Sequence, residues 1–221
     1  MSASLLWLIW AATLDTLFMV AVSALIGIAF GAPLGIFLAT SRRGELFAAP
    51  NSNRLLGLVV NSVRSTPFII LVVAIIPFTR LVTGTSIGTT AAIVPLTIAT
   101  IPFVARLVES AIREVDPGLV EAARAMGASP AQIVWKVLVP EARPSITLGI
   151  TLTIVSLIGY SAMVGAVGGG GLGDLGIRYG YQRFMPEMML AVVVVLVVLV
   201  QIVQTSGDLL ARRFDKRSRN N

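Results

Sequence analysis

The sequence predicts an all-α integral membrane protein with five transmembrane helices. Of its 221 residues, 56% are hydrophobic and only 13% are charged, whereas a soluble domain carries about 25% charged residues. Five apolar segments have roughly the length that crosses a bilayer as a helix, about 20 residues each. Lysine and arginine are concentrated in alternate connections between these segments, as expected of a multi-pass protein with one orientation.

The predicted spans lie in chain order at roughly 17–40, 65–81, 87–107, 145–167 and 188–209. The first apolar run starts at Leu5 and is too long for one span, so residues 1–16 are predicted to form a periplasmic or interfacial segment. Trp7 and Trp10 suit the headgroup region, and Asp15 is predicted to cap the helix that follows. A signal peptide is the alternative, but the residues before Trp7 include no basic side chain for its n-region.

The basic residues predict the orientation of the spans. With the N-terminus outside and the C-terminus in the cytosol, only Arg80, Arg178 and Arg183 lie outside. The cytosolic side then carries the other 14 of the 17 Lys and Arg residues, namely Arg42, Arg43, Arg54, Arg64, Arg106, Arg113, Arg124, Lys136, Arg143, Arg212, Arg213, Lys216, Arg217 and Arg219. This bias follows the positive-inside rule and makes 211–221 a basic cytosolic tail. It accounts for the net charge of +6, so the charge indicates no nucleic-acid partner.

The composition excludes several kinds of chemistry. The chain has no cysteine and no histidine. It therefore offers no disulfide, no thiol nucleophile and no cysteine metal site, and it lacks the commonest general base and metal ligand. The predicted spans contain no clustered carboxylates either. We expect no catalytic residue and no metal ligand in this chain, which argues against a membrane-bound enzyme.

The first three spans carry signs of close packing within a bundle. Small residues recur at every fourth position of the first span, at Ser23, Gly27, Gly31, Gly35 and Ala39. Such a stripe shares one helix face and lets a second helix backbone approach closely. The second and third spans hold four prolines, at Pro67, Pro77, Pro95 and Pro102. Proline frees carbonyls that need partners inside the bilayer, so these helices are predicted to face the bundle or a cavity.

The fourth span carries a mixed polar and aromatic face, made by Gly149, Thr153, Ser156, Tyr160 and Met163. Steps of three and four residues align these positions on one side of a helix. Two interpretations stand side by side: the hydroxyls bond to neighbouring helices, or the face lines a narrow translocation path. The glycine-rich segment 168–174 follows on the outside and lacks the lysine of a phosphate-binding loop, so it is predicted to be a flexible or tightly folded connection.

The connection 113–143 is predicted to form two short cytosolic helices. Asp116 is the N-cap of the first, Pro117 opens it, and Gly127 ends it. Its apolar face consists of Leu119, Ala122, Ala123 and Met126. Ser129 and Gln132 form a capping box for the second helix, which is predicted to bury Ile133, Val134, Val137 and Leu138 and to end at Pro140.

The helix pair of 113–143 has the form of a DNA-binding helix-turn-helix. It lies within a few residues of a membrane span at either end, and few basic residues share one of its faces. A docking element for a cytosolic partner fits better. The small Ala122–Ala123 surface lets the helix sit deep in a groove, and Glu121 and Arg124 can set its register.

The same connection resembles the EAA loop of ABC importer permeases. The matching residues are Glu121-Ala122-Ala123, Gly127 after three further residues, and Val137-Leu138-Val139-Pro140. Valines at 137 and 139 replace the usual isoleucine and leucine, a conservative departure. The segments 64–71, 76–80, 84–88, 159–163 and 170–173 look like the methionine importer subfamily of these permeases. The resemblance extends from about Asp15 over nearly the whole chain.

The resemblance implies the type I ABC importer permease fold over 17–210, in a bacterial cytoplasmic (inner) membrane. It implies a homodimer that binds two cytosolic ABC ATPase subunits and an extracytoplasmic methionine-binding protein. The partner ATPase would bind ATP and Mg²⁺, so this chain would need no cofactor of its own. The implied coupling residues are Glu121, Ala122, Ala123, Arg124, Met126, Gly127 and Pro140. Tyr160 and Met163 are predicted to help form a gate at the dimer axis, and Thr153 and Ser156 to line the path.

Two rival functions remain beside the methionine importer. The same architecture could import another amino acid or an osmolyte, because the external binding protein can select the cargo. An ion-coupled secondary transporter usually places ionisable groups at mid-membrane. The predicted spans show none near their centres, since Asp15, Glu109, Glu187 and Asp208 fall at ends.

Overall fold

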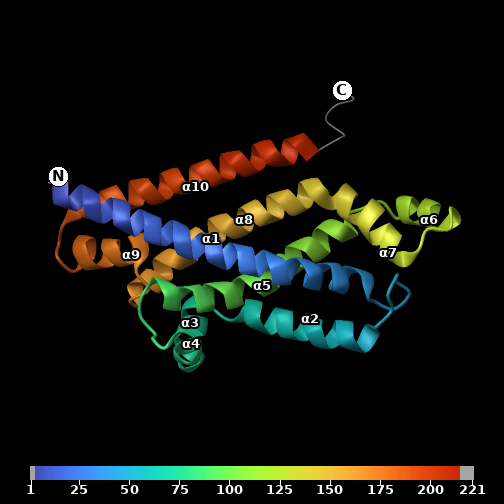
Figure 1. Ribbon diagram of the computed structural model, residues 1–221, viewed down its shortest axis with the longest axis horizontal. Coiled ribbons are helices and arrows are strands. Elements are labelled where there is room, and N and C mark those ends of the chain that lie inside the picture. The colour runs from blue at the N-terminus through green and yellow to red at the C-terminus, as the bar shows by residue number, and fades with distance from the viewer. Residues whose placement is uncertain (1–2, 215–221) are drawn as a thin grey trace.

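The computed structural model describes residues 3–214, and helices make up most of this range (Figure 1). Four long helices run beside one another: α1 (Ala3–Thr40), α5 (Thr89–Arg113), α8 (Val139–Ala166) and α10 (Pro186–Phe214). The short helices are α2 (Pro50–Ser65), α3 (Phe68–Ala74), α4 (Ile76–Thr83), α6 (Pro117–Ala125), α7 (Pro130–Ile133) and α9 (Gly171–Leu175). Two π-helical segments, η1 (Val134–Leu138) and η2 (Gly176–Tyr181), complete the order. No strand occurs within 3–214, so the predicted all-α fold is confirmed.

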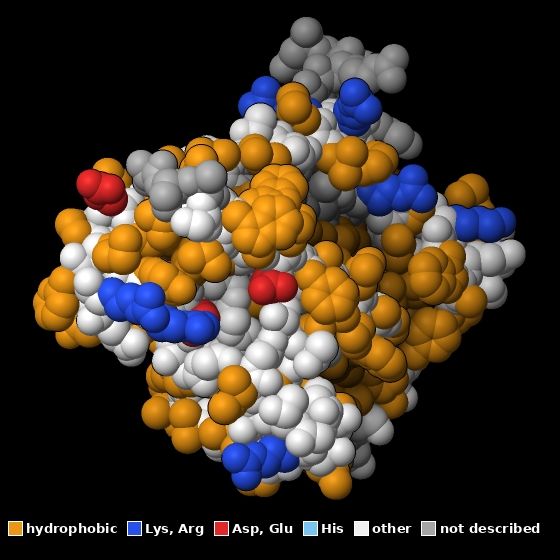
Figure 2. Space-filling model, turned by 60° about the vertical axis from the view of Figure 1, so that its left-hand side comes forward, with side chains coloured by type: hydrophobic (Ala, Val, Ile, Leu, Met, Phe, Trp, Pro, Cys, Tyr) orange, Lys and Arg blue, Asp and Glu red, His pale blue; other side chains and the backbone are white. Residues whose placement is uncertain are grey.

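Four helical stretches of the described chain are long and apolar enough to cross a membrane, and a fifth span results if the bent pair α2 and α3 counts as one. This agrees with the five predicted spans. Hydrophobic side chains cover much of the face in Figure 2, and charged side chains stand there only in separate places. Such a surface suits lipid better than water. Lys216, Arg217 and Arg219, assigned to the cytosolic tail, lie outside the described residues.

The prediction that Asp15 caps the first transmembrane helix is wrong. α1 is one helix of 38 residues, and Asp15 lies inside it. At 1.5 Å per residue such a helix is about 57 Å long, well beyond the roughly 30 Å of bilayer hydrocarbon. Tertiary packing maintains its first turns, because Ile9 and Ala12 are buried against Leu172 and Met188 near the other end of the sequence.

The second predicted span, 65–81, is not one helix. α2 ends at Ser65, and the chain bends by 103° between α2 and α3. Pro67 causes the break: a residue before proline is disfavoured in the helical region, and Thr66 is extended with φ −80° and ψ 125°. Pro77 lies in the first turn of α4, where the missing N–H costs no helical hydrogen bond.

The small-residue stripe of α1 packs directly against α5. A Cβ added at Gly31 would lie 2.6 Å from the carbonyl oxygen of Ile101, and one added at Gly35 would lie 2.5 Å from that of Ala105. At Gly27 the added atom would meet the side chain of Thr100. The two backbones therefore approach more closely than any side chain permits, which confirms the packing predicted from the stripe.

The glycine-rich connection is folded rather than loose. Gly171 has φ +72°, a conformation that favours glycine, and it begins α9. The backbone N–H of Leu172 donates to Oγ1 of Thr16 at 2.9 Å, and both residues are buried. At its other end, the carbonyl of Gly168 accepts from the N–H of Gly88 at the start of α5. The connection thus joins α1, α5 and α8 at one end of the bundle.

We predict that Gly31→Ala destabilises the protein by about 1–3 kcal/mol, because overpacking of this size has that cost. The added methyl meets a backbone carbonyl, which cannot rotate away. The thermal unfolding midpoint of the purified protein in detergent measures the effect. Gly57→Ala is the matched control, since its Cβ would lie 3.7 Å from its nearest neighbour, Nη2 of Arg106. An equal midpoint for both variants would contradict the close α1–α5 contact.

Candidate functional site

The predicted docking helix α6 has well-formed ends. The backbone N–H of Gly118 donates to Oδ1 of Asp116 at 2.8 Å, which makes Asp116 the N-cap, as predicted. At the other end Gly127 adopts φ +78°, and its N–H donates to the carbonyl of Arg124. The N–H of Ala128 donates to the carbonyl of Ala123 at 3.0 Å. These two bonds form a Schellman motif, so the helix ends by a sharp, glycine-dependent turn.

The second short helix begins as predicted and does not end as predicted. Ser129 and Gln132 form the complete capping box. Pro140 does not close the helix, however, because the run continues from Pro130 through η1 into α8 up to Ala166. In η1 the N–H of Val139 donates to the carbonyl of Val134, five residues back. This π-helical register lets the chain pass Pro140, which has no N–H to offer, without ending the helix.

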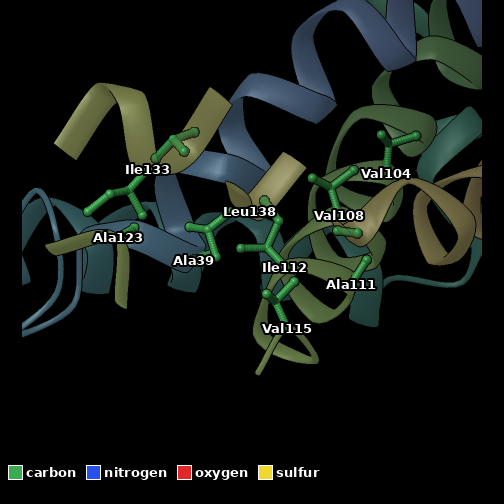
Figure 3. Packing of buried hydrophobic residues seen from close by; sticks show 11 residues of the cluster. Ala39, Val104, Val108, Ala111, Ile112, Val115, Ala123, Ile133 and Leu138 are labelled. Carbon is green, nitrogen blue, oxygen red and sulfur yellow. The ribbon is translucent and has the colours of Figure 1, made fainter. Parts of the chain in front are cut away.

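One side of α6 is anchored and the other is free. Ala123 is only 3% exposed and belongs to a buried cluster with Ile133, Val134, Leu138 and Ile112 (Figure 3). The predicted coupling residues Glu121, Ala122, Arg124 and Met126 are exposed, and Met126 is 82% exposed. A large exposed methionine beside a small alanine is typical of a surface that adapts to a partner.

The predicted face of α8 divides into two parts. Gly149 and Thr153 are buried, and Thr153 is only 1% exposed, with its hydroxyl donating to the carbonyl of Gly149. Ser156 and Tyr160 are half-buried, and Met163 is 48% exposed. The structure therefore brings Ser156, Tyr160 and Met163 towards a surface, whereas it places Thr153 in the interior of the protomer.

Tyr160 contacts a helix that the sequence did not connect with it. Its ring stacks on Phe68 of α3, with centroids 4.4 Å apart and an angle of 16° between the planes. The two rings form part of the wall of a pocket that also contains Arg64 and Phe103. Arg64 was assigned to the cytosolic side by its place before the predicted second span. Arg64 lies in the last turn of α2, just before the bend at Pro67, and its side chain is exposed.

Three arginines converge on one buried carboxylate at the end of the bundle near α6. The side chain of Glu109 is 5% exposed, and Oε1 lies 3.3 Å from Nη2 of Arg42 and 3.0 Å from Nη2 of Arg113. Oε2 accepts from Nη1 of Arg106, whose Nη2 also donates to Oδ1 of Asn61 at 2.8 Å. The cluster ties α2, α5 and the chain just after α1 together. Arg42 and Glu109 carried no joint signal in the sequence, being 67 positions apart.

The described residues include no group of three or more acidic, histidine or cysteine side chains that could hold a metal ion. The structure has two candidate functional surfaces: the exposed side of α6 at one end of the membrane bundle, and the surface of α8 with hydroxyl, aromatic and thioether groups. The first suits docking of a partner protein, and the second suits passage of a solute.

These features define a class of protein, the membrane-embedded subunit of a binding-protein-dependent transporter. The chain belongs to the family described as "binding-protein-dependent transport system inner membrane component", which matches residues 31–220. It is 58% identical over 210 residues to the probable D-methionine transport system permease protein MetI of Vibrio cholerae, which covers 95% of this chain and 93% of that protein. It is 50% identical over 165 residues to D-methionine transport system permease protein MetI of Escherichia coli, covering 75% and 76% of the two chains.

Solved structures support the same classification. The chain matches a structure of the MetNI methionine ABC transporter in inward-facing conformations with a TM-score of 0.95 and 48% identity, over 98% of this chain and 100% of that one. A structure of an amino acid ABC transporter with histidines matches with a TM-score of 0.78 at 21% identity, over 93% and 94% of the chains, which shows the shared fold alone. The predicted type I importer permease fold is confirmed. The chain is a permease subunit and not an enzyme.

We predict that Glu109→Gln destabilises the protein by about 2–3 kcal/mol. Removing one partner of a buried ion pair costs about 3–5 kcal/mol, and the partial exposure of the three arginines lowers that figure. Chemical or thermal unfolding in detergent measures the change.

Asp174→Asn is the control for this measurement, since Asp174 pairs with a single arginine, Arg178, whose side chain is 57% exposed. An exposed pair of this kind contributes about 0–1 kcal/mol. If Glu109→Gln costs no more than Asp174→Asn, the arginine cluster does not stabilise this end of the bundle.

Proposed function

We propose that this chain forms the translocation path for methionine in an ABC importer of the bacterial cytoplasmic membrane. The observation that carries the proposal is α6, which is anchored through Ala123 and exposes Glu121, Ala122, Arg124 and Met126 at one end of the bundle. Such a helix transmits a partner's movement to the membrane helices. The names of the relatives support methionine as the cargo, and the similarity to this chain covers most of the length of each relative.

The proposed assembly contains two copies of this chain, two cytosolic ABC ATPase subunits and an extracytoplasmic methionine-binding protein. ATP and Mg²⁺ belong to the ATPase subunits. Support for the ATPase partner comes from the close match to MetNI along the whole chain, and support for the binding protein comes from the family description. Membrane lipid surrounds the bundle on its apolar outer surface.

The proposed orientation has the N-terminus outside and the C-terminus in the cytosol. The basic residues of the sequence support it, since 14 of the 17 Lys and Arg residues fall on the cytosolic side in this orientation. The ends of the bundle agree with this arrangement, because the N-terminus and α9 lie at one end and α6 at the other (Figure 1).

An amino acid is zwitterionic, and burying its charges in hydrocarbon costs several kcal/mol or more. Two copies of the chain must therefore enclose a polar path. We assign Ser156, Tyr160 and Met163 to its surface and keep Tyr160 and Met163 as the gate, since they are the accessible members of the α8 face. Thr153 lies behind this surface, where its buried hydroxyl donates to the carbonyl of Gly149 within α8.

Two alternatives differ from this proposal in the cargo or in the energy source. Another amino acid or an osmolyte would use the same architecture, and competition against methionine uptake separates these cargoes. An ion-coupled transporter has no use for an exposed docking helix. Retrieval of an ATPase with this chain separates that case.

We predict that an ATPase co-purifies with the wild-type chain from membranes in mild detergent, and that Glu121→Ala and Gly127→Pro weaken or abolish the retrieval. Gly127→Pro is incompatible with φ +78° and removes the N–H that bonds Arg124. Glu187→Ala, in the first turn of α10, is the matched control and should leave retrieval unchanged. Absence of an ATPase with the wild-type chain would remove the importer proposal.

We predict that Met163→Ala raises ATP hydrolysis by the assembled complex in the absence of cargo. Truncation of an adaptable side chain at the gate loosens the closed state that restrains the ATPase. The rate of phosphate release without binding protein measures this effect. Met189→Ala, at a half-buried methionine on α10, is the control for methionine truncation as such. An unchanged basal rate for Met163→Ala would count against the gate.

A further inference from the structure

α8 and α10 pack side by side (Figure 1) and leave a groove between them. Its volume of about 310 Å³ lies within the range of about 300–1,000 Å³ that is typical of small-molecule sites. Six apolar side chains, Gly159 and the amide of Gln201 line the groove, so Gln201 is the one polar side chain among the described lining residues. At 1.5 Å per residue, Gln201 lies about 20 Å from either end of α10. The groove therefore combines an apolar lining with one amide near the middle of a transmembrane helix.

Gly159 leaves open space in this groove. It is exposed, and a Cβ added to it would meet no atom within 4 Å. The other two glycines of α8 are different, since Gly149 lies against Leu107 and Gly165 lies against the backbone of Gly173. A glycine inside a helix costs about 1 kcal/mol relative to alanine. Close contacts within the protomer account for Gly149 and Gly165 but not for Gly159, so the space at Gly159 suits an occupant from outside the protomer.

The exposed surface of α10 has an apolar side and a polar side. The apolar side carries exposed residues at helical spacing, namely Val198, Ile202 and Leu209. The polar side begins in the middle of the helix and continues towards its C-terminal end at steps of three and four residues, with Gln201, Gln204, Thr205 and Asp208.

The amide of Gln201 forms no hydrogen bond with any of the described residues, whereas Nε2 of Gln204 donates to Oδ1 of Asp208 at 3.5 Å. An unpaired amide in hydrocarbon is costly, and polar side chains in membrane spans usually face protein or a water-filled path. The polar side of α10 therefore suits water or a polar ligand, and the apolar side suits lipid.

Three kinds of occupant could fill the groove. A helix of a second copy fits it poorly, because the α10 wall consists of Leu196, Val197, Val200 and Gln201 and offers none of the small residues that let helix backbones approach. A lipid acyl chain would leave the amide of Gln201 unpaired. An amino acid with a long apolar side chain matches both parts of the groove: the side chain suits the apolar lining, and the amide can donate to a carboxylate or accept from an ammonium group.

We propose that the groove between α8 and α10 binds the transported amino acid during its passage, with the apolar side chain of the cargo against Gly159 and its charged groups at Gln201. The inference rests on the proposed import function and adds a cargo contact within the permease itself. Gly159 directly precedes Tyr160 and lies one turn before Met163, on the α8 surface that we assign to the path. A neutral amide binds a zwitterion weakly, which allows the cargo to leave again. The groove selects amino acids with an unbranched apolar side chain as a class.

Cysteine labelling tests the proposal in proteoliposomes that contain the complex of permease and ATPase, because the chain has no cysteine of its own. Gly159→Cys and Gln201→Cys each place one thiol in the groove. A small cationic thiosulfonate reagent, which reacts only where water has access, should label both variants. Excess methionine should slow this labelling at least threefold, and glycine at the same concentration should slow it less, since glycine has no side chain to fill the groove.

Two further variants are the controls. Ile202→Cys lies next to Gln201 but on the apolar side of α10, so the reagent should not label it. Thr205→Cys lies one turn further along the polar side and outside the groove, so the reagent should label it and methionine should slow that labelling less than twofold.

Absence of labelling at both groove positions would overturn the proposal, since the groove then faces lipid. Oxidative cross-linking of two copies through Gln201→Cys in place of labelling would also overturn it, because a second copy then fills the groove. Equal slowing by glycine and methionine, or equal slowing at Thr205→Cys, would show that the cargo side chain does not occupy the groove.

Uptake of radiolabelled methionine by the complete complex with its binding protein separates this inference from the proposed function. Gly159→Leu fills the groove and should lower uptake per ATP hydrolysed at least tenfold, whereas Ile202→Leu should match the wild type. Equal uptake by Gly159→Leu and the wild type would overturn the groove alone. Failure of the proposed function has a different signature, because the wild-type complex itself then imports no methionine.

Discussion

The close approach of α1 to α5 is the contact on which the rest of the fold depends. Gly27, Gly31 and Gly35 leave no room for a side chain between the two backbones. Because lipid is as apolar as the side chains, no hydrophobic driving force brings helices together in a membrane, and they associate largely through such van der Waals packing. The buried cluster next to α6 includes Ala39 of α1 and Val104 of α5, and the central cluster includes residues of both helices as well. α2, α4, α8 and α9 pack directly on this pair, and α10 packs in turn on α8 and η2.

The features that the sequence predicted well depend on nearby residues. The caps of α6 and α7 involve Asp116, Gly127, Ser129 and Gln132, each within a few positions of its partner. The glycine stripe of α1 repeats at helical spacing, so its packing role was visible without knowledge of the partner helix. The long apolar helices followed from composition alone, because a bilayer requires about 20 apolar residues from every span.

The features that the sequence did not predict depend on distant residues. Asp15 stays helical because Ile9 and Ala12 are covered by Leu172 and Met188, which no local pattern indicates. Pro140 is passed by a π-helical register, and local rules treat such a proline as a stop. The second span was predicted from composition as one helix over 65–81, whereas the chain bends by 103° between α2 and α3 at Pro67.

The packed core around α1 and α5 also connects α6 with the pocket lined by Phe68, Phe103 and Tyr160. Ala123, Ile133 and Ile112 share one buried cluster (Figure 3), and packed interiors transmit displacement because they deform little. A force on α6 therefore acts on α5, and Phe103 of α5 lies in the wall of the pocket. Phe68 of α3, which follows the bend at Pro67, belongs to the same pocket lining. A displacement of α5 therefore changes this lining, while the close packing at Gly31 and Gly35 keeps α1 and α5 together.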